Sequence, residues 1–277
     1  MAPTVLITGT SSGIGHSLAR EFKSRGYTVF ATARKTSSID DLSKLGIETL
    51  ALEVTSKESI DALKEEIISR TGGKLDILVN NAGRNYTVPA LDVDYDEIEL
   101  TFRTNVYAVM QMCQAFAPLL MASKGTIVQI GSVAAIQPYV FGSTYNASKA
   151  ALHSYSDTLR VELSPFDVKV VVVITGGVKS EIARTKRVLP PDSIYVPVEK
   201  EYQERLVHSQ TNGMETDLYA RTVVSKLLAS PGRYDIWAGG KSTLIWFVST
   251  FLPKSTWIIV FTRMFSLFKL RQHNKTV

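Results

Sequence analysis

Three polar side chains, Ser132, Tyr145 and Lys149, carry the chemistry that the sequence suggests most directly. Tyr145 and Lys149 are four residues apart, so on a helix they project from the same face, one turn from each other. An ammonium beside a phenol favours the phenolate, so a phenol with an ordinary pKa of about 10 can exchange protons nearer neutral pH. Ser132 is expected at a strand end, where its hydroxyl could hold a carbonyl oxygen against that phenol. Such a group is suited to protonating an oxygen while a hydride reaches the attached carbon.

A glycine-rich turn near the start of the chain predicts the source of that hydride. Residues 5–8 form an apolar, β-branched run typical of a buried parallel strand, and residues 17–22 have a helical pattern. Glycines between a strand and a helix allow a tight turn and let a pyrophosphate approach backbone N–H groups at the helix N-terminus. We therefore expect a dinucleotide there. The residues expected to contact it are Gly9, Ser11, Ser12, Gly13, Ile14 and Gly15.

Strand and helix patterns alternate along most of the chain, which predicts an α/β fold with a doubly wound, Rossmann-like parallel sheet. Active residues then gather at the carboxyl ends of the strands. We expect a single domain over residues 1–238, followed by an apolar tail over residues 239–277. The predicted strands lie near 4–8, 27–32, 47–52, 75–79, 125–131, 168–174 and 233–237. The predicted helices lie near 14–25, 39–45, 57–70, 94–122, 143–164 and 215–229.

Taken together, these motifs resemble the short-chain dehydrogenase/reductase family. The resemblance extends from about residue 3 to about residue 237 and implies one doubly wound α/β domain, an NAD(P) cofactor and interconversion of carbonyls and alcohols. It also implies a homo-oligomer formed through the fourth and fifth helices. The matching residues are Thr8-Gly9-x-x-x-Gly13-Ile14-Gly15, Asn80-Asn81-Ala82-Gly83, Asn105, Ser132 and Tyr145-x-x-x-Lys149.

The end of the second predicted strand indicates which dinucleotide is bound. An NAD site usually places an acid there for the ribose 2′-hydroxyl, whereas this chain has Ala33 followed by Arg34. Arg34 is suited to pairing with a 2′-phosphate, so we predict NADP; the alternative is that Arg34 merely faces solvent. The resemblance adds Glu53 near the adenine and Asn81 near the adenosine ribose. Thr32 completes the contacts expected in this half of the site.

The resemblance also assigns roles around the nicotinamide. Tyr145 is the general acid, Ser132 binds the carbonyl oxygen, and Lys149 lowers the pKa of Tyr145 and holds the nicotinamide ribose. Asn105 matches the residue that holds a water linked to Lys149. The Pro-Gly that usually follows the sixth strand is replaced by Thr175-Gly176-Gly177, and the second glycine is expected to loosen this turn. Val178 and Ser180 are the remaining predicted contacts.

Several other classes of function are disfavoured. The formal net charge is +5 without a stripe of Lys or Arg, which is no nucleic-acid footprint, and the one cysteine, Cys113, excludes a disulfide framework. We expect no metal site. Residues 9–13 also satisfy Gly-x-Ser-x-Gly, the nucleophile elbow of lipases, but no supporting motif accompanies any of the four histidines. A side activity on lipid esters therefore stays a minor alternative, as does a catalytically silent protein that binds lipid surfaces.

Two later segments bear on the substrate and its location. Residues 179–214 are expected to form a loop over the active site, and its basic Arg184, Lys186 and Arg187 beside apolar residues suit an amphiphile with an anionic head, unless these charges merely face solvent. The tail has apolar runs at 244–252 and 257–261, each shorter than the ~18 residues of a spanning helix. It predicts an interfacial helix or hairpin, unless it packs on the domain or on a partner subunit.

Within the family, the stretches at 74–83, 89–92, 141–143, 174–177 and 193–195 resemble the branch that reduces acyl-glycerone phosphates with NADPH. This resemblance implies formation of 1-acyl-glycerol 3-phosphate at the endoplasmic-reticulum membrane or the lipid-droplet surface, facing the cytosol. The same branch is similar to ketoreductases of fungal secondary metabolism. A steroid- or retinoid-like dehydrogenase is a further alternative.

Overall fold

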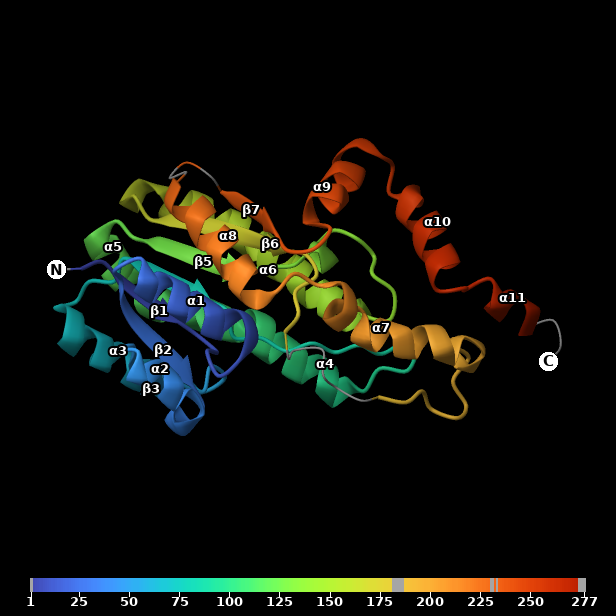
Figure 1. Ribbon diagram of the computed structural model, residues 1–277, viewed down its shortest axis with the longest axis horizontal. Coiled ribbons are helices and arrows are strands. Elements are labelled where there is room, and N and C mark those ends of the chain that lie inside the picture. The colour runs from blue at the N-terminus through green and yellow to red at the C-terminus, as the bar shows by residue number, and fades with distance from the viewer. Residues whose placement is uncertain (1, 181–186, 230–231, 233, 274–277) are drawn as a thin grey trace.

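The computed structural model describes residues 2–180, 187–229, 232 and 234–273, and within them a seven-stranded parallel sheet forms the centre of the molecule (Figure 1). The strand order is β3-β2-β1-β4-β5-β6-β7, so the chain starts in the middle of the sheet, builds outward to one edge and then crosses to build the other. All six pairings are parallel. The strands are β1 (Thr4–Ile7), β2 (Thr28–Ala33), β3 (Glu48–Ala51), β4 (Ile77–Asn80), β5 (Thr126–Ile130), β6 (Lys169–Thr175) and β7 (Asp235–Ala238).

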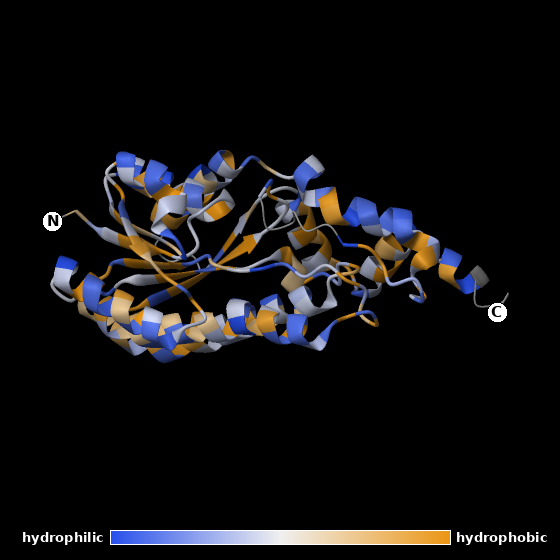
Figure 2. Ribbon diagram, turned by 90° about the horizontal axis from the view of Figure 1, so that it is seen from below, coloured by the Kyte–Doolittle hydropathy of each residue, from blue (hydrophilic) through white to orange (hydrophobic). Residues whose placement is uncertain are grey.

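Helices cover both faces of the sheet, because the strands are apolar on both sides (Figure 2). Alternate residues of β1 illustrate this: Val5 and Ile7 join one buried cluster with α1 and α8, whereas Leu6 joins another with α3, α5 and α6. The helices of the domain are α1 (Gly13–Ser24), α2 (Asp40–Lys44), α3 (Lys57–Thr71), α4 (Tyr95–Phe102), α5 (Ala108–Ser123), α6 (Ser143–Leu163), α7 (Glu199–Asn212) and α8 (Thr216–Ala229). The predicted fold class and all seven strands are confirmed.

Two predicted elements differ from the structure. The single helix expected over 94–122 is interrupted by one π-helical turn at Arg103–Tyr107, which separates α4 from α5. The segment 179–214, expected to be a loop, contains α7 preceded by a short 3-10 turn at Val196–Val198. The helix forms because Tyr202 and Leu206, one turn apart, bury their side chains beneath it. Arg184 and Lys186 lie outside the described residues.

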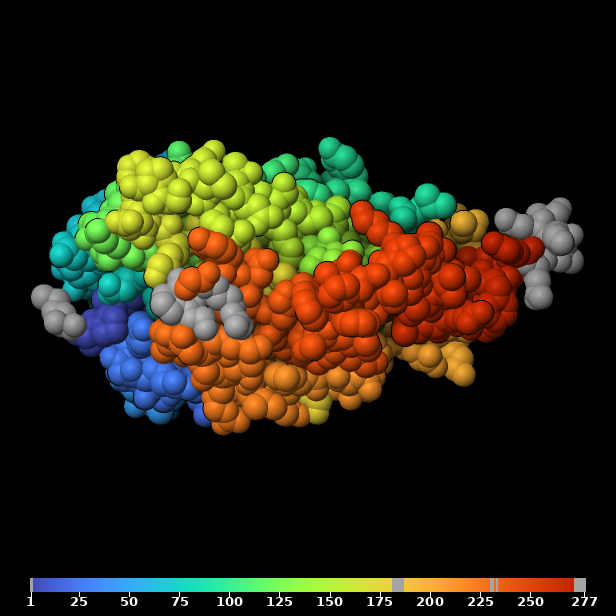
Figure 3. All heavy atoms as spheres, turned by 90° about the horizontal axis from the view of Figure 1, so that it is seen from above, coloured from blue at the N-terminus to red at the C-terminus, as the bar shows by residue number. Residues whose placement is uncertain are grey.

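The tail consists of three short helices, α9 (Ser242–Phe251), α10 (Ser255–Met264) and α11 (Lys269–His273), which lie along one side of the domain (Figure 3). Ile245, Trp257, Phe261 and Phe265 are buried in one cluster with domain residues that include Phe141 and Tyr202. A salt bridge of 2.6 Å between Lys269 and Glu201 joins α11 to α7. One face of the tail therefore packs on the domain.

The opposite face of the tail is apolar and exposed. Phe251 and Ile258 expose 61% and 64% of their surface, and Lys254 between them is also exposed. Within the described residues, one continuous helical stretch, Tyr95–Ser123, is long and apolar enough to cross a membrane by length and composition alone. Its inner residues pack in the core beneath the sheet, which is the ordinary arrangement for a core helix.

Candidate active site

The turn between β1 and α1 is shaped by its glycines. Gly9 and Gly13 have φ angles of +70° and +58°, in the left-handed region that glycine adopts without strain. A Cβ on Gly15 would lie 2.3 Å from the carbonyl oxygen of Gly9, so only glycine fits there. The backbone can consequently fold tightly enough for a phosphate to approach the N-terminus of α1.

Asn81 fastens this turn to the end of β4. Its side-chain nitrogen donates to the carbonyl oxygens of Thr8 and Gly9 at 2.8 and 2.9 Å. In return, the hydroxyl of Thr8 accepts from the backbone nitrogens of Asn81 and Ala82. The segment 80–83 thus holds the cofactor turn in shape.

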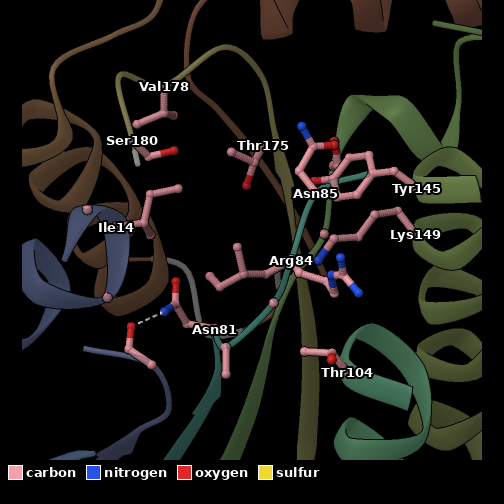
Figure 4. A pocket seen from close by; sticks show the side chains of 18 of the residues that line it. Ile14, Asn81, Arg84, Asn85, Thr104, Tyr145, Lys149, Thr175, Val178 and Ser180 are labelled. Carbon is pink, nitrogen blue, oxygen red and sulfur yellow. Dashed lines mark hydrogen bonds between the residues drawn. The ribbon is translucent and has the colours of Figure 1, made fainter. Parts of the chain in front are cut away.

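A cavity of about 630 Å³ begins at this turn and extends along the carboxyl ends of the strands to α6. Figure 4 shows Tyr145 and Lys149 projecting into it from α6, across from Ile14 and Asn81. Most of the residues predicted from the sequence share this cavity although they come from distant parts of the chain. They are Gly9, Ser11, Ser12, Gly13, Ile14, Gly15, Arg34, Glu53, Asn81, Ser132, Tyr145, Lys149, Val178 and Ser180.

Two predicted site residues do not line the cavity. Thr32 is fully buried, and its hydroxyl donates to the carbonyl oxygen of Ile7, so its side chain ties β2 to β1. Asn105 lies in the π-helical turn, where its side chain exchanges hydrogen bonds with the backbone of Arg84 and donates to the Ser148 hydroxyl. Asn105 therefore supports the floor of the site beside α6.

Ser132 and Tyr145 form the reactive pair. Both side chains line the cavity, and the Ser132 hydroxyl is held by the backbone nitrogen of Ala134, which donates to it at 3.1 Å. Burial raises the pKa of Tyr145, while the nearby Ser132 hydroxyl and the positive charge of Arg205 act in the opposite direction. In the protein without cofactor, Tyr145 is thus a protonated phenol, suited to donating its proton.

Lys149 lies beside Tyr145 on α6, as its spacing predicts. Its ammonium donates to the carbonyl oxygen of Ile130 at 2.8 Å and lies 5.9 Å from the centre of the Tyr145 ring. Burial lowers the pKa of Lys149 to about 8. The lowering of the Tyr145 pKa by Lys149 stays a prediction. In the protein without cofactor, the positive charge that opposes the rise in the Tyr145 pKa is that of Arg205.

His153 is a site-supporting residue that sequence reasoning missed. Its Nε2 accepts a hydrogen bond of 3.2 Å from the backbone nitrogen of Ser132, and a Cβ on Gly131 would lie 2.3 Å from the same ring nitrogen. Burial, followed by the charge of Lys149, lowers the pKa of His153 to about 4, so the ring is neutral at physiological pH. The position of His153, four residues after Lys149, is the signal that could have placed it on the active face of α6.

We expect His153 to make folding stability depend on pH between about 4 and 6.5. In that window the unfolded chain binds a proton that the folded chain does not, so the contribution of this residue is present above pH 6.5 and is lost as the pH falls towards 4. His153→Gln keeps an acceptor but cannot titrate. Urea unfolding of both proteins should show the wild type losing more stability than the variant between pH 7 and 5. A constant difference across this range would contradict the assignment.

The loop after β6 is held firmly, contrary to the expected loosening by its second glycine. Thr175, which replaces the proline, shares a hydrogen bond of 2.6 Å with the Tyr219 hydroxyl. Gly177 pairs with Gly240 through two backbone hydrogen bonds of 2.8 and 3.0 Å, and a Cβ on Gly176 would lie 2.4 Å from the carbonyl oxygen of Gly240. Close packing against the start of the tail therefore requires a glycine at position 176.

The far wall of the cavity comes from the loop before α6, which the sequence did not predict to take part, and from α7, which lies in the segment 179–214 expected over the active site. Tyr139, from the loop before α6, and Arg205 and Ser209, from α7, all line it. Arg187, one of the basic residues expected to face substrate, instead bonds Glu97 at 3.4 Å and lies 4.6 Å from the Tyr86 ring centre. The positive charge of Arg187 is therefore paired with Glu97 within the protein.

The esterase alternative finds little support in the geometry. His16 binds Asp41 at 2.6 Å, which supplies a histidine and an acid near the glycine turn. Among the described residues, however, no hydrogen bond connects His16 to Ser11 or Ser12. No group of three or more His, Cys, Asp or Glu side chains suited to a metal occurs in the part of the chain that the structure describes.

Comparisons with known proteins agree with this architecture. Residues 3–188 match the family described as short chain dehydrogenase. The chain is 39% identical over 270 residues to the short-chain dehydrogenase fogD of Aspergillus ruber, covering 96% of this chain and 94% of that protein. It is 43% identical over 203 residues to the NADPH-dependent 1-acyldihydroxyacetone phosphate reductase of Schizosaccharomyces pombe, covering 71% of this chain and 69% of that protein.

A solved structure shares the fold. It is a short-chain dehydrogenase from Streptomyces avermitilis, with a TM-score of 0.78 and 28% identity, covering 88% of this chain and 90% of that one. The family match over residues 3–188 spans more than half of the chain and includes the glycine turn, Ser132, Tyr145 and Lys149. This protein belongs to the short-chain dehydrogenase family and is an oxidoreductase.

Proposed function

We propose that the protein reduces a ketone to a secondary alcohol with NADPH. The observation that carries this proposal is that Ser132, Tyr145 and Lys149 line the same cavity as the glycine turn. When bound, the cofactor supplies the hydride. The hydroxyls of Ser132 and Tyr145 then face the carbonyl oxygen of the substrate.

Each residue has a distinct task in this reaction. Tyr145 donates its proton to the oxygen as negative charge develops there. Ser132 donates a hydrogen bond to the same oxygen and so stabilises that charge in the transition state. Lys149, anchored on the Ile130 carbonyl, lies close enough to hold ribose hydroxyls and to restore the proton of Tyr145. His153 and Asn105 position this group without touching the reacting atoms.

The cofactor is NADP. Arg34 is exposed at the mouth of the cavity next to Ala33, so a ribose 2′-phosphate would meet a guanidinium and no carboxylate at this point. The relative from Schizosaccharomyces pombe is named as NADPH-dependent. Glu53, which accepts hydrogen bonds from the backbone and hydroxyl of Thr55, lies where the adenine would fit.

For the substrate, we favour an acyl-glycerone phosphate, which would yield 1-acyl-glycerol 3-phosphate. The 43% identity to a reductase of this compound supports the choice. The second candidate is a ketone of fungal secondary metabolism. The similarity to fogD covers 96% of this chain, and the name of fogD gives no substrate, so this similarity is compatible with either candidate.

Consumption of NADPH by the purified full-length protein tests the substrate. The panel should contain an acyl-glycerone phosphate, aromatic polyketide ketones and a 3-oxosteroid. We expect the highest kcat/KM for the acyl-glycerone phosphate. Turnover of a polyketide ketone with no turnover of the phosphate would favour the second candidate, and turnover of none of the ketones would contradict the proposal.

We further propose that the exposed face of the tail rests on a membrane, at the endoplasmic reticulum or a lipid droplet, with the catalytic domain in the cytosol. Large apolar side chains such as Phe247, Phe251 and Ile258 expose more than half of their surface on α9 and α10. Lys254 and Arg263 are exposed among them, which suits an anionic lipid surface.

Polar substitution of this face should release the protein from lipid. We expect Phe247, Phe251, Ile258 and Ile259, all changed to Ser, to lower partitioning onto phosphatidylcholine–phosphatidylserine liposomes by about 100-fold, because each side chain loses its apolar contact. Deleting the tail is a poorer test, since it would uncover the cluster around Phe141.

The matched control changes Leu45, Val161 and Phe166, which are exposed elsewhere on the domain, to Ser. Liposome sedimentation should be unaffected by this control, and reduction of a water-soluble ketone should be unaffected in both variants. Equal partitioning of the tail variant and the wild type would show that the tail is not the lipid-binding surface.

A further inference from the structure

Arg205 is a buried cation that lines the substrate side of the cavity. Only 8% of its surface is exposed, and its side chain enters from α7 opposite the cofactor turn. Its Nε donates to the carbonyl oxygen of Val140 at 3.3 Å, and its guanidinium carbon lies 3.7 Å from the centre of the Tyr139 ring. The guanidinium is therefore fixed in place along one edge and one face.

The ring that supports Arg205 is itself held from several sides. The hydroxyl of Tyr139 is hydrogen-bonded to His208 of α7. Its ring packs against Phe261 and Phe265 of the tail, with ring centres 5.5 and 6.0 Å away. Arg205 is consequently part of a rigid wall built by the loop before α6, by α7 and by α10.

Within the described residues, no carboxylate lies within salt-bridge distance of Arg205. The contrast with its neighbours is informative, because Arg84 and Arg187 both pair with Glu97, and Lys269 pairs with Glu201. Burying an unpaired charge is costly unless a partner of opposite sign reaches it. A guanidinium that is rigid, buried and open to the cavity is thus prepared for an anion that arrives from outside the protein.

We propose that Arg205 binds an anionic group of the substrate, a phosphate or a carboxylate, located a few bonds from the ketone carbon. The inference rests on the proposed ketone reduction and narrows its substrate to anionic ketones. Arg205 lines the same cavity as Ser132 and Tyr145, so an anion on the guanidinium keeps the ketone near these two hydroxyls. A planar guanidinium suits both anions because it can donate two parallel hydrogen bonds.

Steady-state kinetics with matched ketone pairs test this role. One pair is an acyl-glycerone phosphate and the corresponding acyl-glycerone, and the other is 3-oxodecanoate and its methyl ester. We expect the wild type to prefer the anionic member of each pair that it reduces. Arg205→Met should raise KM for that member by 10- to 100-fold, the range expected for lost charge-assisted hydrogen bonds, and should leave KM for the neutral member within about threefold.

The two proposals fail in different ways. If the enzyme reduces neither glycerone but prefers 3-oxodecanoate over its ester, and Arg205→Met removes that preference, the substrate assignment is wrong and the role of Arg205 stands. Arg205→Lys, which keeps the charge, should recover part of the preference, and the affinity for NADP should match the wild type in both variants. The role proposed for Arg205 would be overturned if Arg205→Met raised KM equally for anionic and neutral ketones. It would also be overturned if the wild type did not prefer the anionic member of any pair.

Discussion

Replacing Tyr145 with phenylalanine should lower kcat for ketone reduction by about three orders of magnitude and leave NADPH binding intact. The substitution removes one hydroxyl and keeps the ring, so the buried packing around α6 is preserved. Without the hydroxyl, no group of matched acidity meets the developing alkoxide, and general acid catalysis typically contributes 10²–10⁴-fold. Ser132 retains its hydrogen bond from Ala134 and can still orient the carbonyl. Stopped-flow consumption of NADPH measures the first effect, and NADPH fluorescence titration the second.

Tyr155→Phe is the matched control for this prediction. Tyr155 lies on the same helix and packs against the core cluster that contains Cys113, away from the cavity. Loss of its hydroxyl should change stability modestly and leave kcat within about twofold. If Tyr145→Phe kept more than a tenth of the wild-type kcat, another group would have to be the proton donor.

The sheet was predictable because its strands are buried on both faces and therefore read as unbroken apolar runs. Such runs in β1 and β6 leave little choice of secondary structure, and the glycine turn after β1 fixes which ligand approaches the sheet edge. The reactive residues followed from spacing on one helix. This is why the structure brings Tyr145 and Lys149 together with the turn at residues 9–15 as the sequence suggested.

The helix α7 and its Arg205 were not predictable in the same way. Eleven of the residues from 199 to 212 are polar or charged, apart from Tyr202, and only two pairs of buried positions mark its inner face. Read locally, Arg205 looks like any cation on a solvated helix. Its burial depends on Tyr139 and on Phe261, which lie 66 residues before it and 56 residues after it. Contacts over such separations leave no periodic trace in the sequence.

The replacement of Pro by Thr175 is a second case in which contacts between residues distant in the sequence determine the structure. A glycine pair in a loop indicates freedom when only local geometry is considered. In the folded protein the partner of Thr175 is Tyr219, and the partners of the glycines are residues 238–240 at the start of the tail. The tail thus closes the nicotinamide loop, a role that its apolar composition alone did not indicate.

The choice of NADP over NAD should depend on Arg34. We expect Arg34→Leu to raise KM for NADPH by 10- to 100-fold, since a guanidinium contributes charge-assisted hydrogen bonds to the 2′-phosphate worth about 1.5–3 kcal/mol. KM for NADH should stay within about twofold, because a ribose 2′-hydroxyl offers no charge for Arg34 to bind. Unfolding temperature should also be unchanged, as Arg34 is exposed at the rim of the cavity. Initial rates at saturating ketone, measured over a range of NADPH or NADH concentrations, give the two KM values.

Lys35→Leu separates a specific contact from a general loss of positive charge. Lys35 is the next residue, is equally exposed and does not line the cavity. Removing its charge weakens the long-range attraction slightly for both cofactors, and somewhat more for the more highly charged NADPH; 0.5 M salt should abolish this effect. The Arg34 effect should survive at that ionic strength, because direct hydrogen bonds to a phosphate are screened far less than a distant charge. A loss of NADPH affinity that was equal in both variants, or that vanished in salt, would show that the 2′-phosphate is held elsewhere in the site.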